Sequence, residues 1–306
     1  MWFSFTELIR NHNCCLNMNK QNPVLMIMPA DMVDMGGFPV RQPFPTRNVD
    51  QIDPFLLLHH ANVEHKGGRS AKDVGIGPHP HRGFSPVTFI FEGDVHHRDS
   101  RGNSSIVKEG GVQWMDAGMG IIHSERTSEE LAQNGGEQEI IQLWVNLPAD
   151  KKMIQPHYQA IDKETQPVVF KGNGELRLVA GDYDGIKGPV DTKLPVNALM
   201  GRLGKGDKLT LKKPAGWSGF IYLLSGKIRI EGFGMVDKLN MVYLRGAAEE
   251  IPIEVLEETK ILFLSGQPLE EEVTHYGPFV MTTQTEIMEA MRDYQQGKMG
   301  VLIEEF

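Results

Sequence analysis

The stretch SPVTFIFEGDVHHRD at residues 85–99 decides the fold, because it contains an apolar run, a turn and a second run. The β-branched and aromatic residues of 87–91 favour a strand, and Gly93 marks the turn. The stretch WSGFIYLLSGKIRIEG at residues 217–232 has the same rhythm, and its Gly226 lies 133 residues after Gly93. This self-similarity indicates a duplicated β domain, although two unrelated hairpins would also share the rhythm.

Short apolar runs of this kind continue along most of the chain. Turn signals separate them, such as EGD at 92–94, SRGN at 100–103 and LSGK at 224–227. Many short strands between such turns are typical of an all-β sandwich or barrel. The predicted strands are Phe55–Leu58, Val87–Phe91, Ile140–Val145, Leu176–Val179, Phe220–Leu224, Lys227–Ile230 and Ile261–Leu264.

The organisation of the chain follows from these patterns. Residues 1–22 are polar and irregular, which predicts a flexible N-terminal extension. We expect one β-barrel over residues 23–160 and a second over 161–306. The second unit also carries the one predicted helix, for which Thr283 and Glu286 form a capping box and Gly297 is the stop.

The composition narrows the class of protein. The chain has 306 residues and a formal net charge of −9, which argues against direct contact with nucleic acid. No stretch approaches the ~18–20 apolar residues of a membrane span, and the first 20 residues do not have the pattern expected of a secretory signal. The adjacent Cys14 and Cys15 indicate incidental thiols of a cytoplasmic protein. A metal site of these cysteines with His12 is the alternative, but it lacks the usual ligand spacing.

The histidines are concentrated in the first half. Of the 11, eight lie between His59 and His123, and none lies between His157 and His275. The adjacent pairs, at 59–60 and at 96–97, are expected at the surface, in turns or beside the ligands of a metal. Two neighbouring side chains of a strand point to opposite faces, so neither pair can converge on one point.

Two other pairs have the spacing of metal ligands. Residues two apart in a strand share a face, so His79 can converge with His81, and His123 with Glu125. A barrel interior would then hold three imidazoles and one carboxylate, a set that suits Fe, Zn, Mn, Ni or Cu. An isolated His-x-His is common without a metal, and it is the second pair that favours a site.

Five motifs together resemble the pirin family of the cupin superfamily, in order and over most of the chain. They are HPHRGF at 79–84, EGDVHHRDSRG at 92–102, GVQWMDAGMGIIHSE at 111–125, LWVNLP at 143–148 and SGQPLEEEVTHYGPFVMTT at 265–283. The resemblance implies an all-β bicupin, which consists of two cupin barrels with a C-terminal helix. It also implies one mononuclear divalent metal, usually Fe(II), in the N-terminal barrel. The implied ligands are His79, His81, His123 and Glu125.

The second barrel of pirins binds no metal. Here Lys212 and Pro214 stand 133 residues after His79 and His81, and neither replaces an imidazole. One departure lies in the first barrel, where HPHRGFSPVTF replaces the more frequent HPHRGFETVTY. Ser85 thus stands where many pirins have Glu. We expect metal binding to survive this change, because the implied carboxylate ligand is Glu125.

The resemblance implies a function of the quercetin 2,3-dioxygenase type, with O₂ and a small aromatic chelating compound as substrates. Glu125 is the expected catalytic base. The alternative is a regulatory protein that binds a transcription factor or a metabolic enzyme and senses redox state through its metal. The acidic charge of the chain permits such a protein partner. A third possibility is a metal-binding scaffold with a different substrate.

Overall fold

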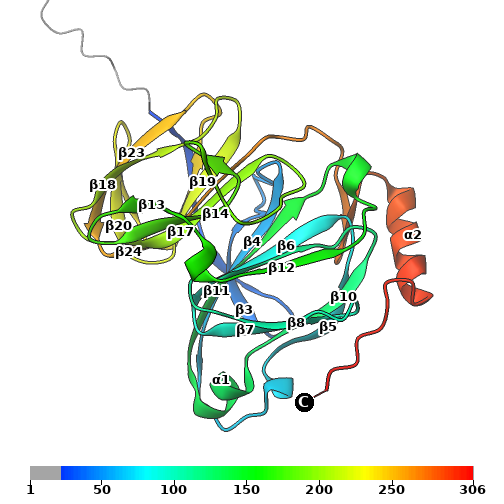
Figure 1. Ribbon diagram of the computed structural model, residues 1–306. Coiled ribbons are helices and arrows are strands. Elements are labelled where there is room, and N and C mark those ends of the chain that lie inside the picture. The colour runs from blue at the N-terminus through cyan, green and yellow to red at the C-terminus, as the bar shows by residue number, and fades with distance from the viewer. Residues whose placement is uncertain (1–21, 306) are drawn as a thin grey trace, which may run out of the picture.

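The computed structural model describes residues 22–305 and contains two β-barrels that lie side by side, with a helix against the outer side of one of them (Figure 1). The predicted N-terminal extension, apart from Asn22, lies outside the described residues, as do Cys14, Cys15 and His12. The all-β class is confirmed. Within residues 22–305, no helix is long and apolar enough to cross a membrane.

The N-terminal barrel consists of two antiparallel sheets. Its larger sheet has the strand order β12 (His157–Ile161), β9 (Val112–Asp116), β6 (Phe84–Glu92), β11 (Gly136–Asn146), β4 (Phe55–His65), β3 (Pro39–Phe44) and β2 (Asp31–Asp34). Its smaller sheet has the order β5 (Gly75–His81), β10 (Ile121–Arg126), β7 (Asp94–Asp99) and β8 (Ser104–Lys108).

The C-terminal barrel repeats this arrangement. Its larger sheet has the order β1 (Val24–Pro29), β22 (Asn240–Leu244), β19 (Ser218–Leu223), β24 (Thr259–Gly266), β17 (Val196–Leu203), β14 (Glu175–Ala180) and β13 (Val168–Lys171). Its smaller sheet has the order β18 (Lys208–Lys212), β23 (Glu250–Glu257), β20 (Lys227–Ile230) and β21 (Gly234–Asp237). The two hairpins seen in the sequence occupy equivalent places, as β6–β7 and β19–β20. Gly93 and Gly226 have φ angles of 73° and 78° there, and a turn with positive φ favours glycine.

All seven predicted strands are confirmed within longer or closely matching strands. The predicted helix is α2 (Gln284–Gln295), and its capping box between Thr283 and Glu286 is present. A second, short helix, α1 (Glu129–Asn134), was not predicted, because its six residues are too few to show helical periodicity. Ser128 caps it through its side chain.

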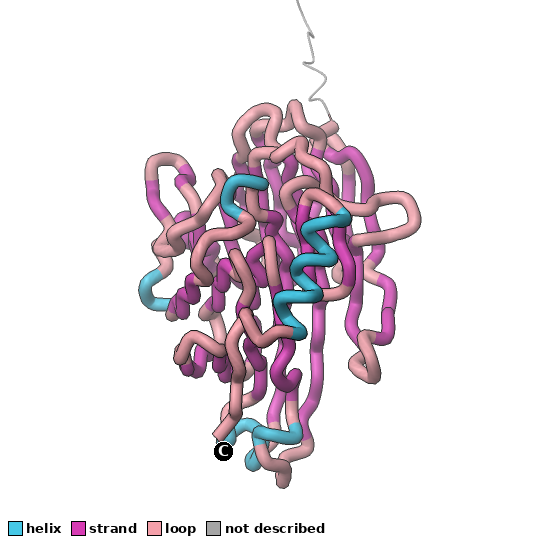
Figure 2. Tube along the Cα trace, turned by 90° about the vertical axis from the view of Figure 1, so that its right-hand side faces the viewer, coloured by secondary structure: helices cyan, strands magenta, loops and turns pink. Residues whose placement is uncertain are grey.

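The sequence suggests a division between the two barrels at residues 160 and 161, and this division stays a prediction. Two segments pack with the barrel formed by the other half of the chain. The first strand, β1, pairs with β22 of the C-terminal barrel. The chain end instead packs on the N-terminal barrel, and Figure 2 shows α2 in front of its strands. Arg82 forms an ion pair with Asp293 of α2 at 3.1 Å, and Arg126 forms one with Glu304 at 2.8 Å.

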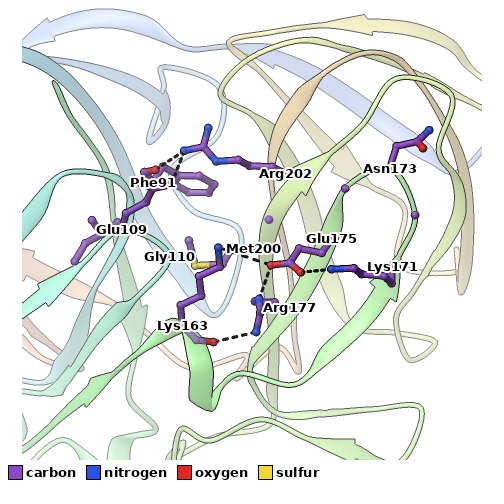
Figure 3. Close-up of a pocket in the computed structure, with 14 residues that line it drawn as sticks. Phe91, Glu109, Gly110, Lys163, Lys171, Asn173, Glu175, Arg177, Met200 and Arg202 are labelled. Atoms are coloured by element: carbon purple, nitrogen blue, oxygen red, sulfur yellow. Dashed lines mark hydrogen bonds and ion pairs between the residues drawn. The ribbon is translucent and has the colours of Figure 1, made fainter.

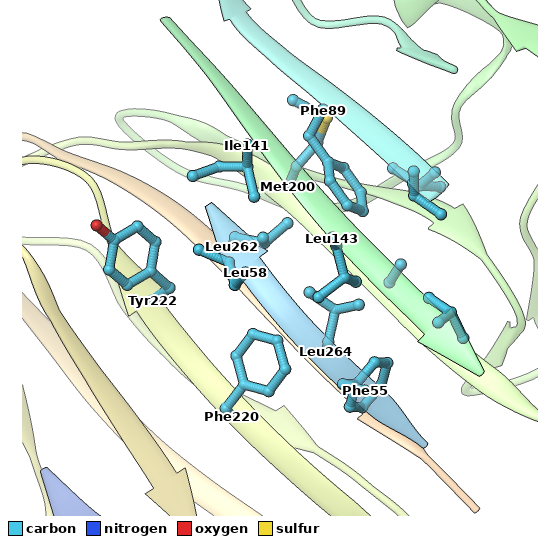
Figure 4. Close-up of a cluster of buried hydrophobic side chains, with 14 of the residues drawn as sticks. Phe55, Leu58, Phe89, Ile141, Leu143, Met200, Phe220, Tyr222, Leu262 and Leu264 are labelled. Atoms are coloured by element: carbon cyan, nitrogen blue, oxygen red, sulfur yellow. The ribbon is translucent and has the colours of Figure 1, made fainter. Parts of the chain in front are cut away.

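The larger sheets of the two barrels share one apolar core. Phe220 of the second barrel lies edge-on against Phe44 and Phe55 of the first, with ring centroids 5.7 and 5.3 Å apart. Figure 4 shows that Leu143 and Leu264 meet in the same layer. Since these side chains are fully buried, the hydrophobic effect stabilises the pair of barrels as well as each barrel.

A buried polar cluster lies at the edge of this core. His60 contacts the Tyr222 hydroxyl at 2.9 Å and the Glu139 carboxylate at 3.1 Å. The Lys260 ammonium donates to the other Glu139 oxygen at 2.6 Å. Burial raises the pKa of Glu139, but hydrogen bonds from His60 and Lys260 outweigh it and lower the pKa to about 2. The carboxylate is therefore charged at neutral pH and links both barrels.

The interiors of the two barrels differ in chemistry. The interior of the C-terminal barrel is filled by side chains such as Leu199, Ile221 and Phe263, which belong to one apolar cluster and are 0% exposed. In the N-terminal barrel, Thr88 and Gln142 occupy the register positions that match Ile221 and Phe263. The first barrel thus replaces apolar packing with polar groups, and this is where the histidines lie.

Candidate metal centre

Three histidines converge inside the N-terminal barrel. His79 and His81 come from β5, and His123 comes from β10 directly opposite His79 in the register. One ring nitrogen from each lies within 4.8 Å of the others, and within residues 22–305 these are the only three side chains grouped as a possible metal site. The rings of Phe84 and Trp144 pack edge-on against His81, with centroids at 5.0 and 5.5 Å, and restrict its rotation.

The three rings present unpaired nitrogens to one another. His79 Nδ1 donates to the Gly77 carbonyl at 2.8 Å. The proton of the ring is therefore on Nδ1, and Nε2 has a free lone pair. Nε2 of His81 and Nε2 of His123 are buried and have no hydrogen-bond partner among the described residues. Burial lowers the pKa of both rings well below the usual value, and the neighbouring imidazoles lower it further. Neutral imidazoles with orphaned buried nitrogens fit a divalent cation.

His97 supports this group from behind. Its Nε2 donates to Asp99 at 3.0 Å, so its Nδ1 accepts from Nδ1 of His123 at 3.5 Å. This order of donors leaves Nε2 of His123 deprotonated and turned toward the cluster. The His97 ring stacks on Tyr158 with centroids 3.8 Å apart, which holds it in place.

Reasoning from the sequence gave His97 no definite role, although a signal existed. His97 and Asp99 are two residues apart on one strand, so they share a face, and the carboxylate is placed to orient the imidazole. Of the other histidines in the adjacent pairs, His60 lies between the barrels. His96 of β7 is half-buried and contacts Ser104 of β8 at 3.0 Å.

Glu125 lies beside the three histidines but outside their close group. One of its carboxylate oxygens accepts from the Thr88 hydroxyl at 2.6 Å, and the other accepts from the Gln142 amide at 2.8 Å. Residues from β6 and β11 therefore hold the carboxylate toward the interior. The three histidines lie together as expected, and the roles of all four residues as metal ligands stay predictions.

A cavity of about 550 Å³ adjoins this carboxylate. Glu125 and Gln142 form part of its wall, while most of the remainder is apolar, with Val40, Ile76 and Ile140 among its residues. This volume lies within the ~300–1,000 Å³ that is typical of small-molecule sites. None of the three clustered histidines lines the cavity, so a compound in it would reach the candidate site at Glu125.

A second cavity, of about 280 Å³, lies between the barrels and is the one drawn in Figure 3. Its cations are already paired, since Glu175 binds Lys171 at 3.1 Å and Arg177 at 2.8 Å. Hydrogen bonds from Arg177 and Lys171 lower the pKa of Glu175 to about 2. Glu125 lines the larger cavity and not this one, so we place the candidate chemistry in the larger cavity.

Ser85 is directed away from the cluster. Its hydroxyl donates to the buried Asp116 carboxylate at 2.7 Å, on the opposite face of β6 from Thr88. The replacement of the more frequent Glu by Ser85 therefore leaves the surroundings of the three histidines unchanged.

Comparisons with known proteins agree with this geometry. The family model described as Pirin matches residues 37–145, and the model described as Pirin C-terminal cupin domain matches residues 198–300. A Pseudomonas aeruginosa protein whose name gives quercetin 2,3-dioxygenase as a provisional activity is 38% identical over 265 residues, which covers 86% of this chain and 92% of that protein. Pirin from Homo sapiens is 34% identical over 281 residues, which covers 90% and 93% of the two chains.

A solved structure extends the similarity to three dimensions. The crystal structure of quercetin 2,3-dioxygenase from Acinetobacter baumannii superposes with a TM-score of 0.86 at 38% sequence identity. The match covers 92% of this chain and 100% of that one. Both barrels are therefore shared with this relative.

Proposed function

Because the chain belongs to the pirin family, we propose that it is a metal-dependent dioxygenase of the quercetin 2,3-dioxygenase type, acting on a chelating flavonol-like phenol. The observation that carries the proposal is the cluster of three imidazoles, of which His81 and His123 are buried, together with Glu125 at the wall of a large and mostly apolar cavity. The Pseudomonas and Acinetobacter relatives, whose names carry this activity, support it.

We assign the metal to His79, His81 and His123, with Glu125 as the most loosely held ligand. Three nitrogens and one carboxylate suit Fe(II) and also other first-row metals. The hydrogen bonds from Thr88 and Gln142 compete with the metal for the Glu125 oxygens, which supports a weak bond. If all four residues held a six-coordinate metal, two positions would be left for a chelating compound or O₂.

The reaction requires a proton to leave the substrate. A bound divalent metal supplies Lewis acidity, which lowers the pKa of a hydroxyl that it coordinates. A flavonol has such a hydroxyl beside a carbonyl group. Glu125 lies at the wall of the cavity and two residues after His123 on β10, so it accepts this proton as a general base. The apolar walls hold the rings and limit the access of water.

The proposed function is tested by oxygen uptake. We expect iron-loaded protein to consume quercetin and O₂, and the double variant His79→Ala, His123→Ala to show no turnover above the buffer. The variant His275→Ala is the control, because His275 is exposed and lies outside the cluster. Turnover of the wild type that does not exceed that of the double variant would exclude the proposal.

Asp99 is expected to act on the metal through His97 and His123. In Asp99→Asn the amide no longer fixes the His97 proton on Nε2, so His123 loses its set tautomer. Loss of such an outer partner lowers metal affinity by ~10–100-fold. Competition with a chelator measures this affinity.

The control for this prediction is Asp31→Asn, since Asp31 is exposed in β2. Circular dichroism of both variants separates a change in affinity from a loss of fold, because Asp99 also accepts backbone N–H bonds from Arg101 and Asn103. Wild-type affinity in a folded Asp99→Asn protein would contradict the positioning role.

A further inference from the structure

One polar side chain of the cavity has no part in the chemistry above. His59 of β4 lines the cavity and lies directly opposite Gln142 in the register of β4 and β11. Cβ atoms of such cross-strand pairs are ~4.5–5.5 Å apart, and Gln142 in turn donates to Glu125. Gln142 therefore stands between His59 and the Glu125 carboxylate, and all three side chains line the cavity.

The hydrogen bonds behind His59 set its tautomer. The Gln42 amide nitrogen donates to the Pro45 carbonyl at 2.7 Å, which fixes the orientation of this amide. The amide oxygen of Gln42 then accepts from Nε2 of His59 at 2.7 Å. Nδ1 of His59 is left as an acceptor, because the one hydrogen bond of the ring to another group within residues 22–305 is made by Nε2. The ring thus presents a lone pair at the cavity wall.

The position of the C-terminal barrel that is equivalent to His59 is occupied by an apolar residue. Leu199 of β17 pairs with Phe263 of β24 as His59 pairs with Gln142, and Leu199 is fully buried in the apolar interior. His59 is half-buried, and an imidazole in place of leucine is costly there unless its nitrogens find partners. Burial lowers the pKa of His59 to about 4, so the ring stays neutral and Nδ1 remains an acceptor near pH 7.

We propose that His59 is a specificity residue, whose Nδ1 accepts a hydrogen bond from a hydroxyl group on a ring remote from the chelating end of the substrate. The inference rests on the proposed function. It assigns the substrate class as polyhydroxylated flavonols, because an unsubstituted flavonol chelates equally well but leaves Nδ1 unpaired. Removing one partner of a buried hydrogen bond costs about tenfold in affinity.

Binding without turnover tests this proposal. Metal-loaded protein is titrated under anaerobic conditions with quercetin and with 3-hydroxyflavone, which has the same chelating pair but no remote hydroxyl. We expect His59→Leu, which copies Leu199, to weaken quercetin binding about tenfold and to change 3-hydroxyflavone binding less than about twofold. His59→Gln keeps an acceptor and should restore part of the preference.

His275→Leu is the matched control, since it makes the same change at an exposed position outside the cavity. An unchanged ratio of the two affinities in a folded His59→Leu protein would overturn the role of His59 and leave the proposed function standing. If the metal-loaded wild type binds neither compound, the proposed function fails, and the inference fails with it. Equal weakening of both ligands would indicate a general loss of cavity shape and would also overturn the specificity role.

Discussion

Turnover of a flavonol is expected to fall by ~10²–10⁴-fold when Glu125 is replaced by glutamine, while the metal remains bound. The amide has nearly the shape of the carboxylate but cannot accept the proton of the substrate hydroxyl. The three histidines keep their nitrogens in place, because none of them depends on Glu125 for a hydrogen bond. Oxygen uptake and metal analysis of the same sample measure the two quantities.

The control for this prediction is Glu289→Gln. Glu289 is exposed on α2 and does not line the cavity, so its replacement should leave turnover near that of the wild type. Unchanged turnover of Glu125→Gln would exclude the role of base. Loss of the metal in this variant would instead show that Glu125 is a strong ligand, against our assignment of it as the loosest.

Replacing Phe220 by alanine is expected to lower the free energy of unfolding by ~3–5 kcal/mol. Phe220 is 0% exposed and packs against Phe44 and Phe55 of the other barrel, so the change leaves a cavity in the layer that joins the two sheets. The midpoint and slope of urea unfolding measure the effect. The result reports on contacts between barrels, because both ring partners belong to the other half of the chain.

Phe233→Ala is the matched control for the stability prediction. Phe233 is 41% exposed, and its truncation should cost less than about 1 kcal/mol. If the two phenylalanine variants unfold at the same urea concentration, the shared core contributes little to stability. The paired barrels would then depend mainly on their separate interiors.

The features that could be predicted from the sequence are those that depend on residues close together along the chain. Strands such as 87–91 and 261–264 were predictable because a β-strand needs only a short run of suitable side chains. The His-x-His and His-x-Glu pairs were predictable as units for a similar reason, since the alternation of a strand places residues two apart on one face. Helix α1 was not predicted, because its cap and its six residues show no periodic pattern.

The sequence by itself therefore determined the strands, the duplication and the residues that carry the candidate chemistry. Only the tertiary structure decided that His97 stands behind His123, and that Thr88 and Gln142 hold Glu125. It also decided that His59 faces the same cavity. These contacts join strands that are distant along the chain, and the pairing register of the sheets sets them. A local pattern records which face a side chain takes, whereas the register decides which other side chain it meets there.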